Sequence, residues 1–366
     1  MKIKIIRTMK KQLFKQLPLF FLAVLLLTSQ VNAQEVSKEY HKEYKADAST
    51  TLELSNKYGD VVIESWNNNQ VVIDVKVTVE VPGKDRAEKL LGMINVEFSE
   101  GQDVIEAKTV IDNSFNFSGW GGNKRFRIDY NVKMPELTGL ALSNRYGNTD
   151  IDNLSGLVIL DIKYGDLAVE SLTRGNEKPI NSITLAYGKA IIEEAGWLEI
   201  NARYSGSFEI PRSQALLVDS RYSKLRIGET SSVVSDSKYD NFKIEEINNL
   251  VMVSGYTTAD IGTLTRKLDF EGSYASFNVE NIPAGFESLD VNTKYMGVKL
   301  GISQTASYEL DGQASYGNIK IDKDKFKYQR NIVQNNSTEL SGVVGNEEAP
   351  SSRVKIKSSY GSVTLF

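Results

Sequence analysis

The sequence predicts an all-β protein, a β-solenoid expected to be a right-handed β-helix of about 11–12 coils of roughly 18 residues. A small α+β insertion is expected near its N-terminus. Three observations lead there: a tyrosine recurs at near-constant spacing, apolar residues alternate around it with one change of phase, and no single repeat unit buries enough apolar surface to fold alone.

A tyrosine, often followed by glycine or serine, recurs along most of the chain. Between residues 146 and 316 its spacing is 17 to 23 residues. Longer gaps after residues 58 and 316 indicate insertions into a regular array. The members are Tyr58, Tyr146, Tyr164, Tyr187, Tyr204, Tyr222, Tyr239, Tyr256, Tyr274, Tyr295, Tyr316 and Tyr360.

Apolar residues flank each tyrosine in a fixed pattern. Positions six and four before it, and three and five after it, are mostly apolar. Alternate residues of a strand face the same side, so this change of parity requires a bend at the tyrosine. Each repeat unit is therefore a strand, a tyrosine corner and a strand. At Tyr204 the fifth residue is Glu209 and Ile210 follows, which indicates one inserted residue at Ser205-Gly206.

Stacking of the units is expected because each one buries only three or four aliphatic side chains. That is too little to order about 18 residues, so neighbouring units must share a core. A propeller blade would need about 40 residues. An outer-membrane barrel would need an aromatic girdle at both ends of each strand, and the sequence has none.

The expected organisation follows from these patterns. An alternating run at Val71–Val81 and an amphipathic helix at Lys84–Ile94 mark an inserted module, which is expected to cap an open strand edge. The predicted segments are a signal peptide (1–33), a lead segment (34–50), a first coil (51–66), an α+β capping subdomain (67–136), the main solenoid (137–321), a flexible polar loop (322–352) and a final coil (353–366).

The first 33 residues are typical of a secretory signal peptide. Basic residues precede an apolar run from Leu17 to Leu27, and Val31-Asn32-Ala33 forms a small-residue cleavage site. The run is about 11 residues long, too short for a spanning helix, so no integral membrane span is expected after cleavage. The protein is expected in the periplasm, or associated with the outer membrane or cell surface.

Composition excludes several kinds of site. Residues 1–33 hold six of the 43 basic residues and none of the 47 acidic ones, so cleavage would leave a net charge of −10, which disfavours nucleic-acid binding. No cysteine is present, and the one histidine, His41, is expected to be a solvated linker residue. No catalytic residue, metal site or cofactor is predicted.

An aromatic loop is the first candidate ligand contact. Phe115, Phe117 and Trp120 lie in the glycine-rich stretch Asn113–Asn123. They could stack against a sugar or a partner, or fold back on the core of the inserted module. The second interpretation is favoured.

A basic column is the second candidate. The residue before the tyrosine is basic in several units, including Lys163, Arg203, Arg221 and Lys238. The column could bind an acidic polysaccharide or a phosphate, but pairing with carboxylates of neighbouring units is favoured. The tyrosines could likewise bind glycans, but stacking between units explains their repetition and is favoured.

Two other functions remain open. Some solenoids are carbohydrate-active enzymes, namely polysaccharide lyases or glycosidases, and these need clustered carboxylates. Asp60, Asp166 and Asp240 recur near the corners but are dispersed along the chain, where turn preference explains them. An envelope sensor or regulatory protein is the other alternative.

The early unit Asn56-Lys57-Tyr58-Gly59-Asp60 and the late unit Ser358-Ser359-Tyr360-Gly361-Ser362, with the signal peptide and inserted module, carry a resemblance. The chain resembles the putative adhesin family of β-solenoid envelope proteins, which are similar to autotransporter adhesin heads. The resemblance implies a non-enzymatic surface interaction with an envelope glycan or protein. It transfers no catalytic residue.

Overall fold

The computed structural model describes residues 33–115, 125–322 and 326–366. These residues are almost entirely β-strand, which confirms the all-β prediction. They form two compact units: a smaller one (33–38, 78–93, 112–115, 125–126) and a larger one (39–77, 94–111, 127–322, 326–366). The predicted signal peptide lies outside the described residues except for Ala33, where strand β1 begins.

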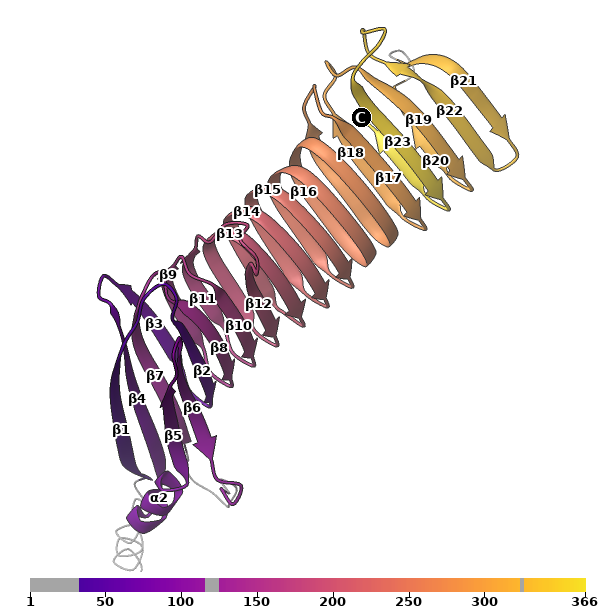
Figure 1. Ribbon diagram of the computed structural model, residues 1–366. Helices are drawn as coiled ribbons and strands as arrows, with labels where there is room; N and C mark the ends of the chain where they lie inside the picture. Colours follow the sequence, from indigo (N-terminus) through magenta and orange to yellow (C-terminus); the bar gives the residue numbers. More distant parts are fainter. Residues whose placement is uncertain (1–32, 116–124, 323–325) are drawn as a thin grey trace, which may run out of the picture. The chain divides into compact units, whose positions relative to one another are not determined.

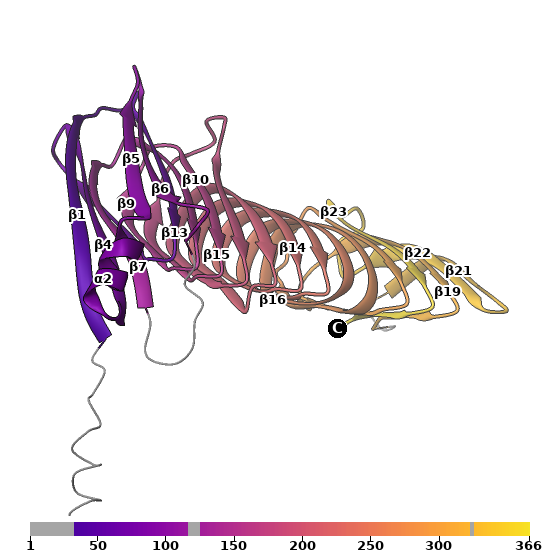
Figure 2. The same cartoon turned by 90° about the horizontal axis from the view of Figure 1, so that it is seen from below.

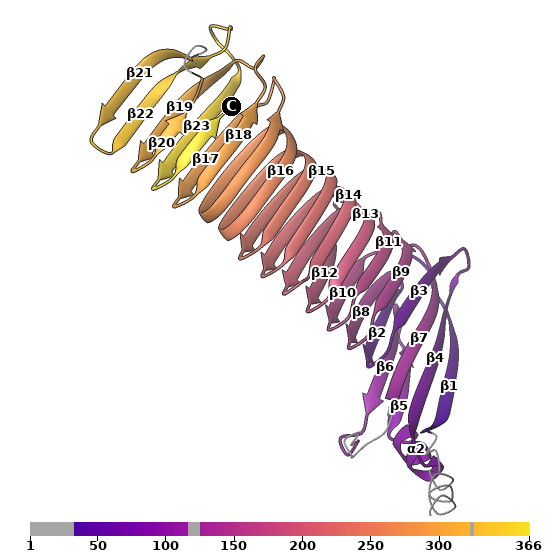
Figure 3. The same ribbon diagram turned by 180° about the vertical axis from the view of Figure 1, so that it is seen from behind.

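Strands that precede the tyrosines pair in parallel and form one row of the larger unit. In this row each strand bonds to the strand of the next repeat unit (Figures 1 and 3). Its members are β2 (Thr51–Lys57), β8 (Gly139–Arg145), β10 (Val158–Lys163), β12 (Asn181–Ala186) and the second halves of β13 (Lys189–Arg203), β14 (Ser207–Arg221) and β15 (Lys224–Lys238).

Strands that follow the tyrosines form a second parallel row. The row contains β3 (Val61–Trp66), β9 (Thr149–Leu154), β11 (Leu167–Leu172) and the first halves of β13, β14 and β15. β16 (Asn241–Ile282) passes through two corners and so contributes to both rows. After it, β17 (Ser288–Lys294) continues the first row and β18 (Gly297–Ile302) continues the second. From β8 to β18 the units succeed one another in chain order (Figure 2).

Aliphatic side chains at the predicted inward positions form the core. The position six residues before the tyrosine is buried throughout, as at Leu140, Leu198 and Leu268. At Tyr204 the predicted insertion is confirmed, because Phe208 and Ile210 are both buried and align with the equivalent residues of the next unit.

The N-terminal insertion is partly a continuation of the two rows. It contains β4 (Gln70–Pro82), α2 (Lys84–Leu91), β5 (Ile94–Glu100), β6 (Val104–Ile111) and β7 (Arg125–Pro135). β4 and α2 lie close to the predicted alternating run and helix, but β6 pairs in parallel with β2, and β7 with β3. β5 then adds to β6 in the antiparallel direction. Part of the insertion is therefore a further layer of the stack, not a separate subdomain.

The predicted lead segment is a strand, β1 (Ala33–Lys45), which pairs with β4. The prediction of a linker for His41 was wrong: His41 Nδ1 lies 2.6 Å from Asp74 Oδ1, and Nε2 lies 3.0 Å from Glu43 Oε1. These hydrogen bonds raise the pKa of His41. Most β1 side chains are exposed, so the segment lacks the apolar alternation that would reveal a strand.

The segment 322–352 contains a β-hairpin, so the prediction of a flexible loop was also wrong. β21 (Phe326–Gln334) and β22 (Ser337–Val344) pair antiparallel, and β22 pairs antiparallel with β19 (Tyr308–Ser315). Eight of the nine β21 residues are exposed. The strand therefore lacks the alternation of buried and exposed side chains that would reveal it.

The repeat unit of Tyr360 does not follow chain order. Its strands are β23 (Ser352–Ser359) and β24 (Ser362–Leu365). β23 pairs in parallel with both β17 and β19, and β24 with both β18 and β20 (Asn318–Lys320). In Figure 1 the yellow β23 accordingly lies between the orange strands β17 and β19. Charge supports this place, since Lys355 aligns with Asp290 on one side and Asp311 on the other.

Candidate functional site

All twelve recurring tyrosines have a left-handed backbone, with φ between 52° and 65°. This conformation costs a non-glycine residue about 1–2 kcal/mol. Two contacts with neighbouring units offset the cost. In most repeat units the tyrosine N–H donates to the carbonyl of the residue before the neighbouring tyrosine, as from Tyr222 to Lys238 at 3.1 Å, whereas the Tyr316 N–H donates to the Asn336 carbonyl. The ring also stacks on its neighbours.

The rings form one unbroken ladder. Adjacent centroids are 4.5 to 5.3 Å apart, and the ring planes differ by 1° to 17°. Each tyrosine is 38% to 59% exposed. An interior ring has both faces covered by other rings and presents only its edge and hydroxyl to solvent. Sugars stack on ring faces, so the interior of the ladder suits packing rather than glycan binding.

Two members of the basic column hold neighbouring repeat units together through ion pairs. Arg203 lies 2.9 Å from Asp219 of the next unit. Arg221 lies 2.9 Å from Asp219 and 3.2 Å from Asp236. Both guanidinium groups also donate to backbone carbonyls. Their charge is therefore engaged within the protein.

The lysines of the column are more open. Lys163 Nζ lies 3.1 Å from Asp161 of its own strand. Lys238 is exposed, and its carbonyl accepts the Tyr222 N–H. The structure does not bring the four basic residues to one pocket, because each belongs to a different unit along the row. A role in ligand binding stays a prediction.

The aromatic loop is described only at its margin. The Phe115 ring meets the Phe126 ring edge-on, with centroids 5.0 Å apart. This contact is of the kind expected if the loop folds back on its own module. Phe117 and Trp120 lie outside the described residues.

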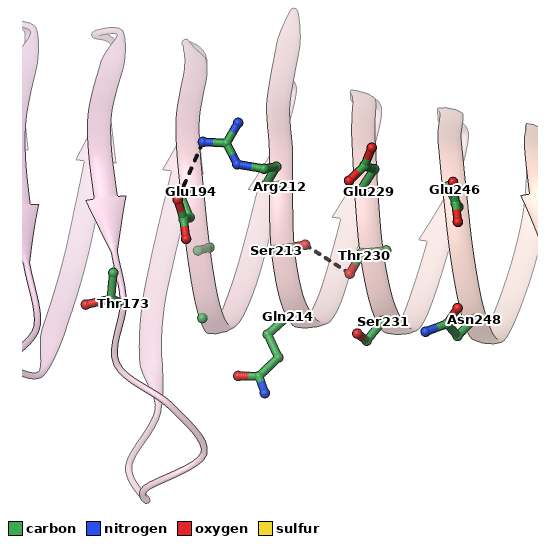
Figure 4. Close-up of a pocket in the computed structure, with 12 residues that line it drawn as sticks. Thr173, Glu194, Arg212, Ser213, Gln214, Glu229, Thr230, Ser231, Glu246 and Asn248 are labelled. Carbon is green, nitrogen blue, oxygen red and sulfur yellow. Dashed lines mark hydrogen bonds and ion pairs between the residues drawn. The ribbon is translucent and has the colours of Figure 1, made fainter.

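A shallow groove that the sequence did not reveal runs across the second row (Figure 4). Glu194, Arg212, Glu229 and Glu246 come from four successive units that align residue by residue. Arg212 pairs with Glu194 at 3.5 Å. The groove, of about 510 Å³, thus presents charges of both signs on neighbouring strands. These four charged residues each lie seven or eight residues after a ladder tyrosine. That recurrence would have been the sequence signal for the groove.

Two further observations concern other kinds of site. Within the part of the chain that the structure describes, no group of three or more His, Cys, Asp or Glu residues is arranged to hold a metal ion. No helix among the described residues is both long and apolar enough to cross a membrane.

Comparison with known proteins gives only distant likenesses. No family model and no curated protein matches the chain. Among solved structures it is similar to a "putative cell adhesion protein" from Clostridium sporogenes, with 12% identity, 90% and 99% of the two chains covered, and a TM-score of 0.20. It is also similar to a "putative adhesin" from Bacteroides fragilis (11%, 90% and 97%, 0.27) and a "putative lipid binding protein" from Parabacteroides distasonis (10%, 90% and 97%, 0.27). At these TM-scores the likenesses carry no argument about this chain.

Proposed function

We propose that the chain is an exported, non-enzymatic protein of the cell envelope, an adhesin-like binding or scaffold module built on a right-handed β-solenoid. The unbroken tyrosine ladder is the observation that carries this proposal. It holds neighbouring units in register and repeats the same outward groups at the strand spacing of about 4.8 Å. Such a rigid, regular surface suits many weak contacts made together with a glycan or protein of the envelope.

One stretch of this surface is apolar. Leu217, Val234 and Val251 align on three adjacent strands of the first row, and Val253 lies beside them. These four side chains are 38% to 47% exposed. Exposed aliphatic groups gathered in this way favour contact with a partner.

Binding to isolated envelope material tests the proposal. The mature chain should bind, and Val234→Lys should weaken binding because it places a charge in the aliphatic stretch. Glu245→Lys is the matched control, since it changes an exposed residue of the second row. No binding by the unaltered chain, or equal loss in both variants, would contradict a surface of this kind.

The alternative of a carbohydrate-active enzyme is tested by a substitution in the groove of Figure 4, where three glutamates come together. The proposal expects no turnover of acidic polysaccharides. Turnover that Glu229→Gln abolishes would replace it with a carbohydrate-active enzyme, since glycoside hydrolysis uses paired carboxylates.

Export is proposed from residues 1–33. The mature protein recovered from cells should begin at Gln34, and protease added to intact cells should separate a surface location from a periplasmic one. A retained N-terminus would contradict cleavage after Ala33.

A further inference from the structure

The ladder ends at a second groove, which lies beside β20 and the β21–β22 hairpin. Its volume is about 830 Å³. Cavities that bind small molecules are usually about 300–1,000 Å³. The residues that the inference uses are Tyr316, Asn318, Lys320, Asn331, Asn335 and Asn336, all of which line the groove.

The groove exists because the two rows end differently. The first row continues past β19 into β22 and β21. In the second row β20 pairs with β24, and no further described strand follows it. The hairpin therefore extends beyond its opposing row. Tyr328 and Val333, which line the groove from β21, remain 42% and 69% exposed.

Tyr316 differs from the interior rings of the ladder. It stacks on Tyr360 at 4.8 Å with the planes 4° apart, and its other face meets no aromatic ring among the described residues. It is 59% exposed, more than any other ladder tyrosine. A flat apolar ligand surface can therefore lie on this ring, as it cannot on the interior ones.

Uncharged polar groups line the same groove. Asn318, Asn331, Asn335 and Asn336 are exposed, and their side chains form no hydrogen bond with a described residue. Each amide supplies two donors and an acceptor, which is the set that pairs of sugar hydroxyls require. Lys320 is the one charged residue among the described residues that line the groove. In the groove of Figure 4, by contrast, four charged side chains come together.

We propose that this groove binds a neutral sugar residue of a glycan, with the C–H face of the sugar on the free face of Tyr316 and its hydroxyls on the asparagine amides. The proposal deepens the proposed function by naming a site and a ligand class. An extended peptide could instead add to β20. However, β20 offers only three residues for pairing, whereas four asparagines line the groove.

The test is a glycan array, probed with the mature chain and carrying neutral and uronic-acid oligosaccharides. We expect binding to neutral members. Tyr316→Ala should weaken it roughly ten-fold or more, because it removes the ring face on which the sugar is proposed to lie. Tyr316→Phe should retain it, since the face is kept. Tyr222→Ala is the matched control, because it removes an interior ring of the same ladder and should leave binding intact.

Thermal unfolding of each variant establishes that it is folded. Asn331→Ala is a second substitution in the groove, and it leaves every tyrosine of the ladder in place. Several results would overturn the proposal: no neutral glycan bound, binding only to acidic members, equal loss in Tyr316→Ala and Tyr222→Ala, or binding to extended peptides in place of sugars. If envelope material is still bound while no array member is, the adhesin-like function stands and this site for it falls.

Discussion

The corners of the stack are built in two ways. From Tyr58 to Tyr187 the residue after the tyrosine is glycine, and the residue two before it is large and buried: Asn56, Asn144, Ile162 and Leu185. From Tyr204 to Tyr256 the residue two before is small, and the residue after is polar and buried: Ser205, Ser223, Asp240 and Thr257. Backbone and ring geometry are the same in both sets. One corner can therefore be filled from either side of the tyrosine, provided that the other side is small.

The two sets differ in what holds neighbouring units together. In the glycine corners the backbones approach closely, and a Cβ on Gly147 would overlap the carbonyl oxygen of Gly59. In the polar corners side chains fill this space. Asp240 accepts from the Ser220 and Ser237 hydroxyls at 2.7 and 2.6 Å, and from the Ser223 N–H at 2.6 Å. The glycine corners thus combine close backbone approach with buried amides at two of them, where Asn56 and Asn144 both donate to the Gly59 carbonyl at 3.2 Å. The polar corners instead have a hydrogen-bond network centred on a buried carboxylate.

The largest effect is expected at a glycine corner. Gly147→Ala should lower the free energy of unfolding by about 3 kcal/mol, because its methyl group displaces the backbone of the neighbouring unit. Urea unfolding followed by circular dichroism measures it. Gly206→Ala is the control in the polar region: its nearest neighbour is the Lys189 side chain at 3.9 Å, and a change below about 0.5 kcal/mol is expected. Equal effects would show that the two regions do not differ in backbone approach.

A smaller loss is expected in the polar region. Asp240→Ala leaves two buried hydroxyls and one buried N–H without their acceptor, which should cost about 2–3 kcal/mol. Asp219→Ala removes a half-exposed side chain (48%) from its ion pairs with Arg203 and Arg221 and should cost less than about 1 kcal/mol. The same unfolding measurement distinguishes them. A nearly neutral Asp240→Ala would mean that the network adds nothing to packing.

The smallest difference between the two regions is expected at the tyrosine ladder. Tyr164→Ala and Tyr222→Ala each remove two stacking contacts of 4.8 to 5.1 Å, so each should lose about 1–3 kcal/mol. Tyr164→Phe and Tyr222→Phe keep the rings and should be neutral. If one alanine variant were much worse than the other, the ladder would depend on how the corner beneath it is filled.

Sequence reasoning found the inward positions because burial imposes a period of two, and the tyrosine marks where the phase changes. The inserted residue before Ile210 was visible for the same reason, since it displaces the buried positions by one. The regular core follows directly from that pattern.

Pairing order and polar strands were harder to predict. Any alternating strand can lie beside any other, so the pattern around Tyr360 does not say that β23 belongs between β17 and β19. Only the charges of Lys355 and its two aspartate neighbours mark that place. β1 and β21 were missed because few of their side chains are buried. The groove at Tyr316 was missed as well, because it depends on where the second row stops.

The position of β23 and β24 bears on how the molecule is made. A chain delivered N-terminus first presents β17 to β20 before residues 352–365 have emerged. The space between β17 and β19 therefore stays open until β23 enters it. Folding of the rows consequently cannot follow the order of synthesis from one end to the other. Without this segment, the edges of β17 and β19 would face each other unpaired within the sheet. No hairpin or terminal strand would cover them there.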